Sequence, residues 1–194
     1  MTLRTLSSRE VYRNPWMTVR EDSIERQDGS TGIYGVVLKP DFSLVIPYEE
    51  GAFHLVEQYR YPVQGRYLEF PMGMWETRPD ASPETVAAGE LKEETGLVAG
   101  RMTYLGQLFI AYGYSNQGMH VFLAEELTPG PQALGPEEGD LVSKKVPVAE
   151  FESLIQSGHI KDSATLSAYC LLRMQRCLPS FGEQGPPISL QRNS

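Results

Sequence analysis

Three features are scarce in this sequence, and each scarcity excludes a class of protein. The 194 residues include two cysteines, Cys170 and Cys177, whose spacing of seven fits neither a CxxC redox motif nor a zinc site. No run of about 18 apolar residues occurs, so no membrane span is expected. Basic residues are outnumbered 25 to 17, and the net charge of −8 argues against nucleic acid as a partner.

The N-terminus also lacks the apolar core of a signal peptide. Its first residues read MTLRTLSSREVYRN, so we expect a cytoplasmic protein whose cysteines are reduced. Hydrophobic residues make up 41% of the chain and charged residues 22%, as in ordinary globular proteins. The length suits one domain with a small extension.

The most informative stretch is Phe70–Leu97, FPMGMWETRPDASPETVAAGELKEETGL. It contains both end signals of a helix. Ser82 is a good N-cap, and Pro83 suits the first helical position. Gly96 suits the position that ends a helix. A polar loop therefore leads from Gly73 into a predicted helix.

Glu90, Glu93 and Glu94 share one face of that predicted helix. Their position is unfavourable, because like charges at this spacing repel by about 0.2–0.5 kcal/mol per pair and carboxylates near a helix C-terminus oppose its dipole. A bound cation would compensate this cost, and Mg²⁺ takes oxygen ligands of this kind. The alternative is a plain acidic surface stripe.

The chain as a whole alternates strands with helices. Residues 11–45 read as short strands without a helix, and they have too little mass for a core of their own. Further strands are expected at 52–59, 102–110, 119–124 and 141–146, and helices at 148–156 and after Asp162. We therefore predict an α/β fold in which helices sandwich a mixed β-sheet. The predicted organisation is an N-terminal antiparallel β extension with a role in dimerisation (1–46), a main domain (47–178) and a disordered tail (179–194).

Two kinds of residue outside the acidic helix are candidate substrate contacts. Arg60 and Arg66 follow or begin strands, and a guanidinium matches the geometry of phosphate, although surface ion pairing is an even alternative. Trp16 could stack on a base or simply contribute to packing.

Gly89–Leu97, GELKEETGL, resembles the core of the Nudix box, whose pattern is Gly-x5-Glu-x7-Arg-Glu-U-x-Glu-Glu-x-Gly-U with U a bulky aliphatic residue. Outside the box, EQYRYP (57–62), LEFPMG (68–73) and GHIKDSATL (158–166) resemble the branch that hydrolyses ADP-ribose and nucleoside diphosphate sugars. The resemblance implies a Nudix fold and a Nudix-type pyrophosphohydrolase.

This Nudix box departs from the family pattern in two places. Gly89 stands where the family has arginine, and Ala81 stands where it has glutamate. The loop from Gly73 to Ala81 is also two residues longer than the pattern allows. In the family the missing pair holds the loop to the helix. We expect Trp75, Glu76 and Arg78 in the longer loop to be candidates for that role.

The resemblance also implies roles for individual residues. Glu90 and Glu94 would be the main ligands of Mg²⁺ (or Mn²⁺), with help from Glu93 and the backbone carbonyl of Met72. Glu93 is also counted among the catalytic residues. A general base would come from the loop GPEEGDL, with Glu137 the first choice and Glu138 the second.

The predicted substrate is a nucleoside diphosphate derivative, cleaved at its diphosphate to a nucleoside monophosphate and a sugar phosphate. Its predicted binding residues are Arg60, Glu69, Trp16 and Gly113. By resemblance the protein would be a homodimer whose N-terminal strands contribute to the partner's site. Two alternatives stay open: another nucleoside diphosphate derivative (a nucleoside triphosphate, dinucleotide or coenzyme) as substrate, or a sensor that binds a nucleotide sugar without cleaving it.

Overall fold

The computed structural model describes residues 3–75, 78, 80–134 and 139–175. Its strands are β1 (Arg4–Arg13), β2 (Thr18–Glu25), β3 (Thr31–Leu38), β4 (Phe42–Glu49), β5 (Ala52–Arg60), β6 (Gly65–Glu69), β7 (Met72–Gly73), β8 (Leu97–Phe109), β9 (Gly118–Pro129) and β10 (Val142–Pro147). Its α-helices are α1 (Pro83–Thr95), α2 (Val148–Gln156) and α3 (Ser163–Met174). A single 3₁₀ turn, Tyr61–Val63, joins β5 to β6.

These strands form two sheets. Strands β1, β2 and β3 make a three-stranded antiparallel sheet. The second sheet has the order β10-β5-β4-β9-β8, with β6 paired to β5 and β7 to β4. Within it β4 and β9 run parallel, whereas the β5–β10 and β8–β9 pairs are antiparallel. The predicted mixed sheet and antiparallel N-terminal extension are confirmed.

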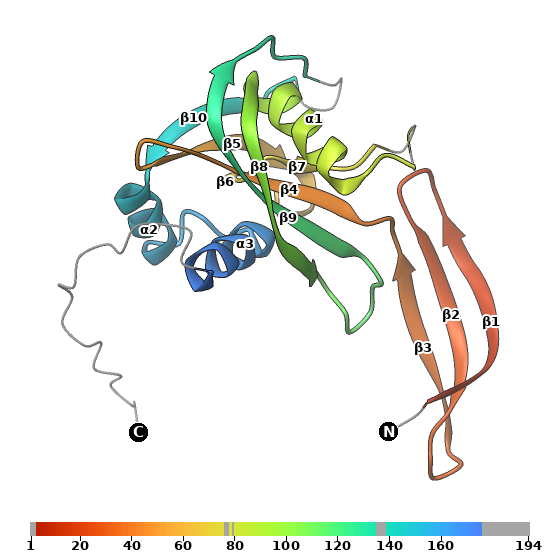
Figure 1. Ribbon diagram of the computed structural model, residues 1–194. Coiled ribbons are helices and arrows are strands. Elements are labelled where there is room, and N and C mark those ends of the chain that lie inside the picture. Colours follow the sequence, from red (N-terminus) through yellow and green to blue (C-terminus); the bar gives the residue numbers. More distant parts are fainter. Residues whose placement is uncertain (1–2, 76–77, 79, 135–138, 176–194) are drawn as a thin grey trace, which may run out of the picture.

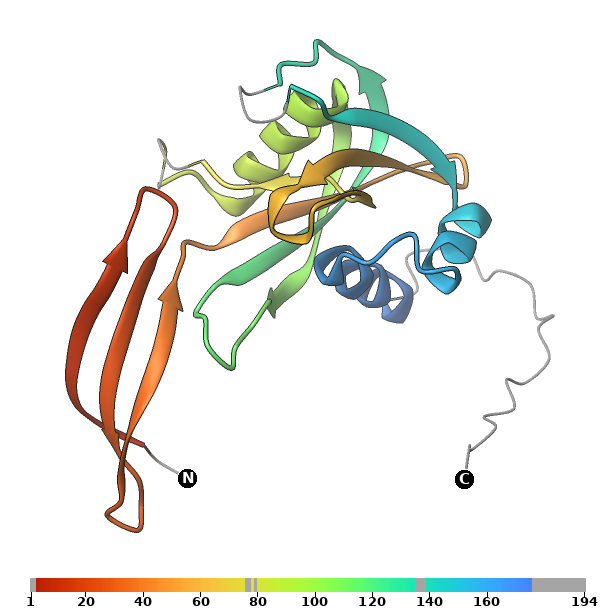
Figure 2. The ribbon, with the colours of Figure 1, turned by 180° about the vertical axis from the view of Figure 1, so that it is seen from behind.

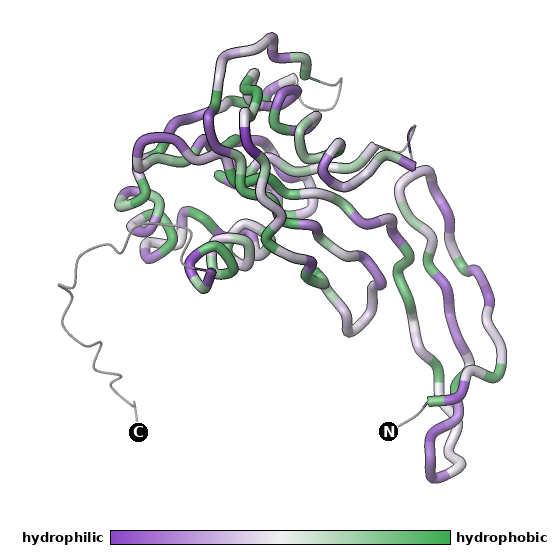
Figure 3. The backbone as a smooth tube through the Cα atoms, viewed as in Figure 1, coloured by the Kyte–Doolittle hydropathy of each residue, from purple (hydrophilic) through white to green (hydrophobic). Residues whose placement is uncertain are grey.

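Helices cover both faces of the second sheet (Figure 1). Strand β4 shows why, since its alternate side chains point to opposite faces. Val45 packs with Ala87 and Leu91 under α1. Leu44 and Ile46 belong to the larger core beneath α2 and α3. Hydrophobic stretches run along the central strands and also along the helices and β3, whereas the tip between β2 and β3 is hydrophilic (Figure 3).

An aromatic cluster fastens the larger core. The ring centroid of Phe53 lies 5.3 Å from that of Phe70 and 5.1 Å from that of Phe151. Tyr169 of α3 completes the cluster, with its centroid 4.9 Å from that of Phe151. The cluster joins β5, the end of β6, α2 and α3, and so fixes α3 relative to the sheet.

The helix ends agree with their sequence signals. Ser82 Oγ accepts a hydrogen bond from the Thr85 N–H at 3.2 Å. Gly96 has φ +70°, a left-handed conformation that favours glycine, and its N–H donates to the Lys92 carbonyl at 3.0 Å. The predicted cap of the last helix, Asp162, accepts from the Thr165 N–H at 2.7 Å.

The N-terminal sheet stands beside the main body rather than on it (Figures 1 and 2). Its links to the β8–β9 connection are polar: the Val37 N–H donates to the Tyr114 carbonyl at 2.7 Å, and the Lys39 N–H donates to Asn116 Oδ1 at 3.0 Å. All ten residues of β1 are exposed. Only its last residues, 11–13, fall in the stretch read as strands, because RTLSSREVYR has no buried face to give it an apolar pattern.

The boundary predicted after residue 46 needs correction. It falls inside β4, whose residues Leu44, Val45 and Ile46 are fully buried in the main domain. The three-stranded sheet ends at Leu38, so the boundary lies in the connection before Phe42. The predicted tail, 179–194, lies outside the described residues. Among the helices that the structure describes, none has the length and apolar character needed to cross a bilayer.

Candidate active site

A cavity of about 570 Å³ opens between α1, the N-terminus of α3, Trp16 before β2 and Lys39 before β4. Its size is typical of a site for a small ligand. It is lined by Trp16, Lys39, Phe42, Arg60, Met72, Gly73, Met74, Trp75, Glu90, Glu93, Ile110, Gln117, Asp162, Ser163 and Ala164. Five residues predicted to form the site, far apart in the sequence, therefore share one cavity: Trp16, Arg60, Met72, Glu90 and Glu93.

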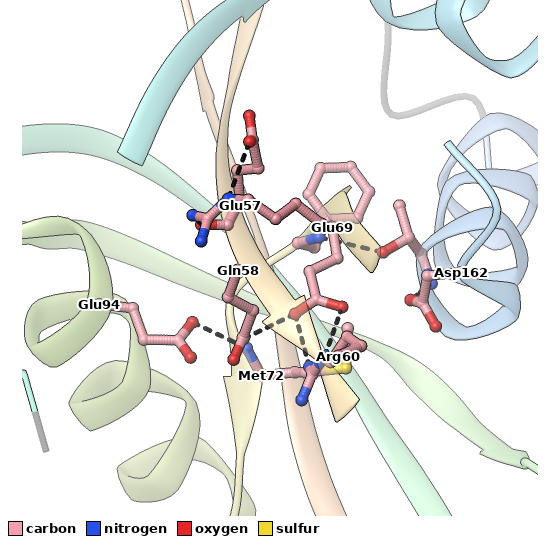
Figure 4. A network of polar contacts seen from close by, with 10 residues as sticks. Glu57, Gln58, Arg60, Glu69, Met72, Glu94 and Asp162 are labelled. Atoms are coloured by element: carbon pink, nitrogen blue, oxygen red, sulfur yellow. Dashed lines mark hydrogen bonds and ion pairs between the residues drawn. The ribbon is translucent and has the colours of Figure 1, made fainter. Parts of the chain in front are cut away.

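The acidic face of α1 meets strand β7 at the cavity wall. Glu90 is 4% exposed and Glu94 is 1% exposed. A side chain at Gly73 would place its Cβ 2.6 Å from Glu90 Oε2, so the carboxylate would have to shift from its present position. The Met72 N–H donates to Glu94 Oε2 at 3.2 Å (Figure 4). The helix and the strand that should supply metal ligands are thus in direct contact.

The donor atoms available here are all oxygens. Glu90, Glu93 and Met72 line the cavity, and Glu94 lies behind them. Across the described part of the chain no group of three or more His, Cys, Asp or Glu side chains is arranged to hold a metal ion. An ion at this site would therefore need water, substrate or the Met72 carbonyl to complete its shell. Mg²⁺ is commonly bound in this way, through one or two carboxylates with water and substrate phosphates, so the residues present fit it.

Arg60 is held in place by the buried carboxylate of Glu69. Arg60 Nη2 lies 2.5 Å from Glu69 Oε1, and Arg60 Nε donates to Glu69 Oε2 at 3.2 Å (Figure 4). Gln58 Nε2 also donates to Glu69 Oε1, at 2.7 Å. Burial raises the pKa of Glu69 above its usual value of 4.5, while the charge and hydrogen bonds of Arg60 oppose that rise.

Glu69 was predicted to bind substrate, and the structure places it differently. Its side chain is 3% exposed and does not line the cavity, whereas the Arg60 side chain is 41% exposed and does. Glu69 therefore holds Arg60 in place from outside the cavity. The sequence did not reveal this pairing, because the register of the β5–β6 hairpin places Glu69 opposite Val56 and Arg60 opposite Gly65, and the ion pair reaches along the hairpin.

Gly113 is not among the residues that line the cavity. Its carbonyl accepts a hydrogen bond from the Tyr34 hydroxyl at 2.7 Å, so it joins the N-terminal sheet to the β8–β9 connection. Arg66, the second candidate phosphate ligand, forms ion pairs with Glu57 and Asp140 instead. This is the surface ion pairing that had been the alternative.

The candidate bases Glu137 and Glu138 lie outside the described residues. Asp140, shortly after them in the sequence, contacts Arg66 of β6. Arg66 Nη2 donates to the Asp140 carbonyl at 2.8 Å.

Two contributors to the cavity were missed as ligand contacts. Lys39 lines the cavity, yet no motif surrounds it; it simply ends a β-rich run. The first residues of α3, Ser163 and Ala164, also line it, so the helix N-terminus faces the cavity. The helix cap at Asp162 was predicted, but its position at the site depends on the tertiary packing of α3.

Comparison with known families fits this arrangement. Residues 37–167 match the family model described as NUDIX domain, which covers more than half of the chain. The chain therefore belongs to the Nudix family and is a Nudix-type pyrophosphohydrolase. Residues 3–37 match a second model, described as nucleoside diphosphate sugar hydrolase N-terminal domain. The predicted resemblance to the ADP-ribose and nucleotide-sugar branch is thereby confirmed.

Individual relatives agree over nearly the whole chain. An ADP-ribose pyrophosphatase of Bacillus subtilis (strain 168) is 26% identical over 177 residues, 90% of this chain and 95% of that protein. A methanol dehydrogenase activator of Bacillus methanolicus is 28% identical, with the same coverage. A crystal structure of an ADP compounds hydrolase superimposes with a TM-score of 0.81 at 25% identity, covering 90% of this chain and 94% of the other.

Proposed function

We propose that the protein hydrolyses the diphosphate bond of ADP-ribose or a related nucleoside diphosphate sugar, with Mg²⁺ (or Mn²⁺) as cofactor. The products would be a nucleoside monophosphate and a sugar phosphate. One observation carries the proposal: a single cavity is lined by carboxylates (Glu90, Glu93), cationic side chains (Arg60, Lys39) and an indole (Trp16). The printed names of relatives, ADP-ribose pyrophosphatase among them, support the same substrate class.

The charges of the cavity suit a diphosphate. Arg60 presents a guanidinium fixed by Glu69, and a pre-oriented guanidinium can bind phosphate oxygens in a bidentate manner. The N-terminus of α3 adds the positive end of a helix dipole. Glu90 and Glu93 would repel the same phosphates. A divalent cation held by the carboxylates would offset that repulsion.

The chemistry divides between the metal and the chain. A bound Mg²⁺ would neutralise phosphate oxygens and make water easier to deprotonate. Glu90, Glu94 and the Met72 carbonyl are proposed to hold it, with Glu93 assisting at the cavity wall. Arg60 orients the diphosphate, and Trp16 offers an aromatic face to a base. Glu137, with Glu138 second, stays the proposed general base that accepts the proton of the attacking water.

A substrate panel tests this proposal. ADP-ribose, nucleotide sugars, nucleoside triphosphates, dinucleotides and coenzymes are assayed for phosphate-containing products with and without Mg²⁺. We expect Glu93→Gln and Glu94→Gln to lose at least about 100-fold in turnover, because each removes a charge placed for the metal or the transition state. Glu84→Gln is the matched control, since Glu84 is an exposed acid in the first turn of the same helix.

Each outcome of the panel points to one function. Full activity in both the Glu93 and Glu94 variants would contradict the proposal. Cleavage of triphosphates or coenzymes in preference to ADP-ribose would identify the alternative substrate class. Tight binding of ADP-ribose without hydrolysis at millimolar Mg²⁺ would identify a sensor.

We also propose that the protein acts as a homodimer through its N-terminal sheet. Strand β1 is an edge strand, and an exposed edge is a template for pairing with another chain. It also carries large apolar residues in solvent: Leu6 is 45%, Val11 46% and Tyr12 54% exposed. Light scattering at micromolar concentration should give twice the mass of the 21.7 kDa chain, and a monomer would contradict the proposal.

A further inference from the structure

Trp75 occupies a slot on helix α1 that exists because residue 89 is glycine. A Cβ built at Gly89 would lie 1.9 Å from Cζ2 of Trp75 and 2.7 Å from Cη2. These distances are far inside van der Waals contact, so any side chain at position 89 would displace the indole. Glycine is the weakest helix former after proline, and its presence in the middle of α1 needs a reason of this kind.

Arg78 holds the same indole from the loop side. Its guanidinium carbon lies 4.7 Å from the ring centroid of Trp75, a cation–π distance. The Arg78 N–H also donates to the Trp75 carbonyl at 3.1 Å, which closes a turn. The indole is therefore held by the helix and by its own loop. Glu76, the third candidate for this role, lies outside the described residues.

The slot lies between the two chain segments that form the acidic wall of the cavity. Trp75 follows Gly73 by two residues, and Gly89 directly precedes Glu90. The clearance between Gly73 and the Glu90 carboxylate is small, since a Cβ at 73 would lie 2.6 Å from Glu90 Oε2. A shift of the loop relative to α1 would therefore change the position of Glu90 against Met72 and Gly73.

We propose that Trp75 is a positioning residue: seated over Gly89, it fixes the loop after Gly73 against α1 and thereby sets the place of Glu90. It does through an apolar and cation–π contact what an ion pair does in the family pattern, where Ala81 and Gly89 are replaced by glutamate and arginine. The packing of Trp75 over Gly89 does not depend on the reaction. Its effect on turnover rests on the proposed function.

The cleanest probe is Gly89→Ala, because it adds one methyl group. Trp75→Ala is less specific, since Trp75 also lines a neighbouring cavity of about 400 Å³ and its removal would enlarge both cavities. The set of variants is Gly89→Ala, Trp75→Ala, Trp75→Phe and the Gly89→Ala/Trp75→Ala pair. Ala88→Gly, on an exposed position of the same helix, calibrates helix propensity without touching the seat.

The first measurement is independent of activity. Helix propensity alone predicts that Gly89→Ala raises the melting temperature, by about as much as Ala88→Gly lowers it. The contact of Trp75 with Gly89 predicts instead that Gly89→Ala lowers the melting temperature when Trp75 is present. In the Trp75→Ala background the same substitution should raise it, as helix propensity predicts. In a Trp16→Phe background Trp75 is the one remaining tryptophan of the chain, and Gly89→Ala should shift its fluorescence emission to the red.

The second measurement reports on positioning. Mn²⁺ binding, followed by titration calorimetry without substrate, should weaken about 10- to 100-fold in Gly89→Ala. The value of kcat/KM should fall on the order of 100-fold, because small misplacements of reacting groups are costly. Trp75→Phe should retain most of both, and the double variant should be no worse than Trp75→Ala.

A rise in melting temperature for Gly89→Ala with Trp75 present, together with unchanged emission, would overturn the proposal. So would unchanged Mn²⁺ affinity and unchanged kcat/KM in a Gly89→Ala protein whose emission has shifted. If no diphosphate is cleaved by the native protein, the proposed function fails. The melting and emission measurements still test whether Trp75 packs over Gly89.

Discussion

Substituting Arg60 with Gln should destabilise the protein more at pH 8 than at pH 5. The substitution removes the cation that faces Glu69. Among the described residues, the Gln58 side chain still donates a hydrogen bond to this buried carboxylate. Removing one partner of a buried ion pair costs about 3–5 kcal/mol. Because the Arg60 side chain is 41% exposed and that of Glu69 3%, water can replace part of the lost contact. We therefore expect a loss of about 2 kcal/mol at pH 8.

The pH dependence follows from the pKa of Glu69. Burial raises this pKa in the folded state above 4.5, so the contribution of Glu69 to stability is present below that value and is lost as pH rises through the folded-state pKa. Arg60 lowers the pKa through its charge and hydrogen bonds. Without Arg60 the folded-state pKa rises further, and more stability is lost at pH 8. At pH 5 a larger fraction of Glu69 is protonated than at pH 8, so the loss is smaller.

Urea unfolding at the two pH values measures the effect. Arg60→Gln/Glu69→Gln should recover much of the stability at pH 8, because no buried charge remains. Arg9→Gln is the control: Arg9 pairs with Glu21, both side chains are exposed, and the loss should be small at either pH. Equal destabilisation of Arg60→Gln at pH 5 and pH 8, or no recovery in the double variant, would refute the reasoning.

Three further substitutions test the description of the site and its scaffold. Gly73→Ala places a Cβ 2.6 Å from Glu90 Oε2, so the Mg²⁺ concentration for half-maximal activity should rise about tenfold or more, and an unchanged value would show that the carboxylate is free to move. Ser82→Ala removes the cap of Thr85 N–H and should cost about 1 kcal/mol in thermal unfolding, with Ser82→Gly losing less. Phe53→Ala should cost about 3–5 kcal/mol, since Phe53 is fully buried at the centre of the aromatic cluster; a loss below about 1 kcal/mol would contradict the packing described.

The helices were predictable because their signals are local. Ser82 and Gly96 mark the two ends of α1, and both adopt the expected cap geometry. Helix α2 has the predicted bounds, and Asp162 caps α3 as expected. A cap depends on a few neighbouring residues, so sequence reasoning can identify it without knowledge of the rest of the fold.

The pairing of strands was less predictable. Strand β1 is exposed on both faces and so lacks the alternation that identifies a strand. The start of the main domain was placed too late because Phe42–Pro47 follows three strands of the extension without a change in composition. That β4 belongs to the second sheet is decided by its pairing with β9, which nothing in the local sequence reveals.

In the candidate site too, features with local sequence signals were predictable and features that depend on tertiary packing were not. The spacing of Glu90, Glu93 and Glu94 identified the acidic face, and the strand-end position of Arg60 identified a cavity residue. The burial of Glu69 beneath Arg60 was not visible, because burial depends on what covers the β5–β6 hairpin. Trp75, Glu76 and Arg78 were named from the sequence as candidates to hold the loop to the helix, but which of them lies over Gly89 depends on the path of the loop.

The position of β4 also constrains when the acidic helix can fold. Its parallel register pairs Phe42 with Met119, 77 residues later, and the segment between them contains β5 to β8 and α1. The N-terminal sheet pairs strands that follow one another in the chain, so it can form early in synthesis. Helix α1 packs on Val45 together with Phe122 and Ala124 of β9. A nascent chain that ends before Gly118 lacks Phe122 and Ala124, two of the five buried residues of this core, so the acidic face of α1 would be assembled late, after the exposed N-terminal edge is already available to a second chain.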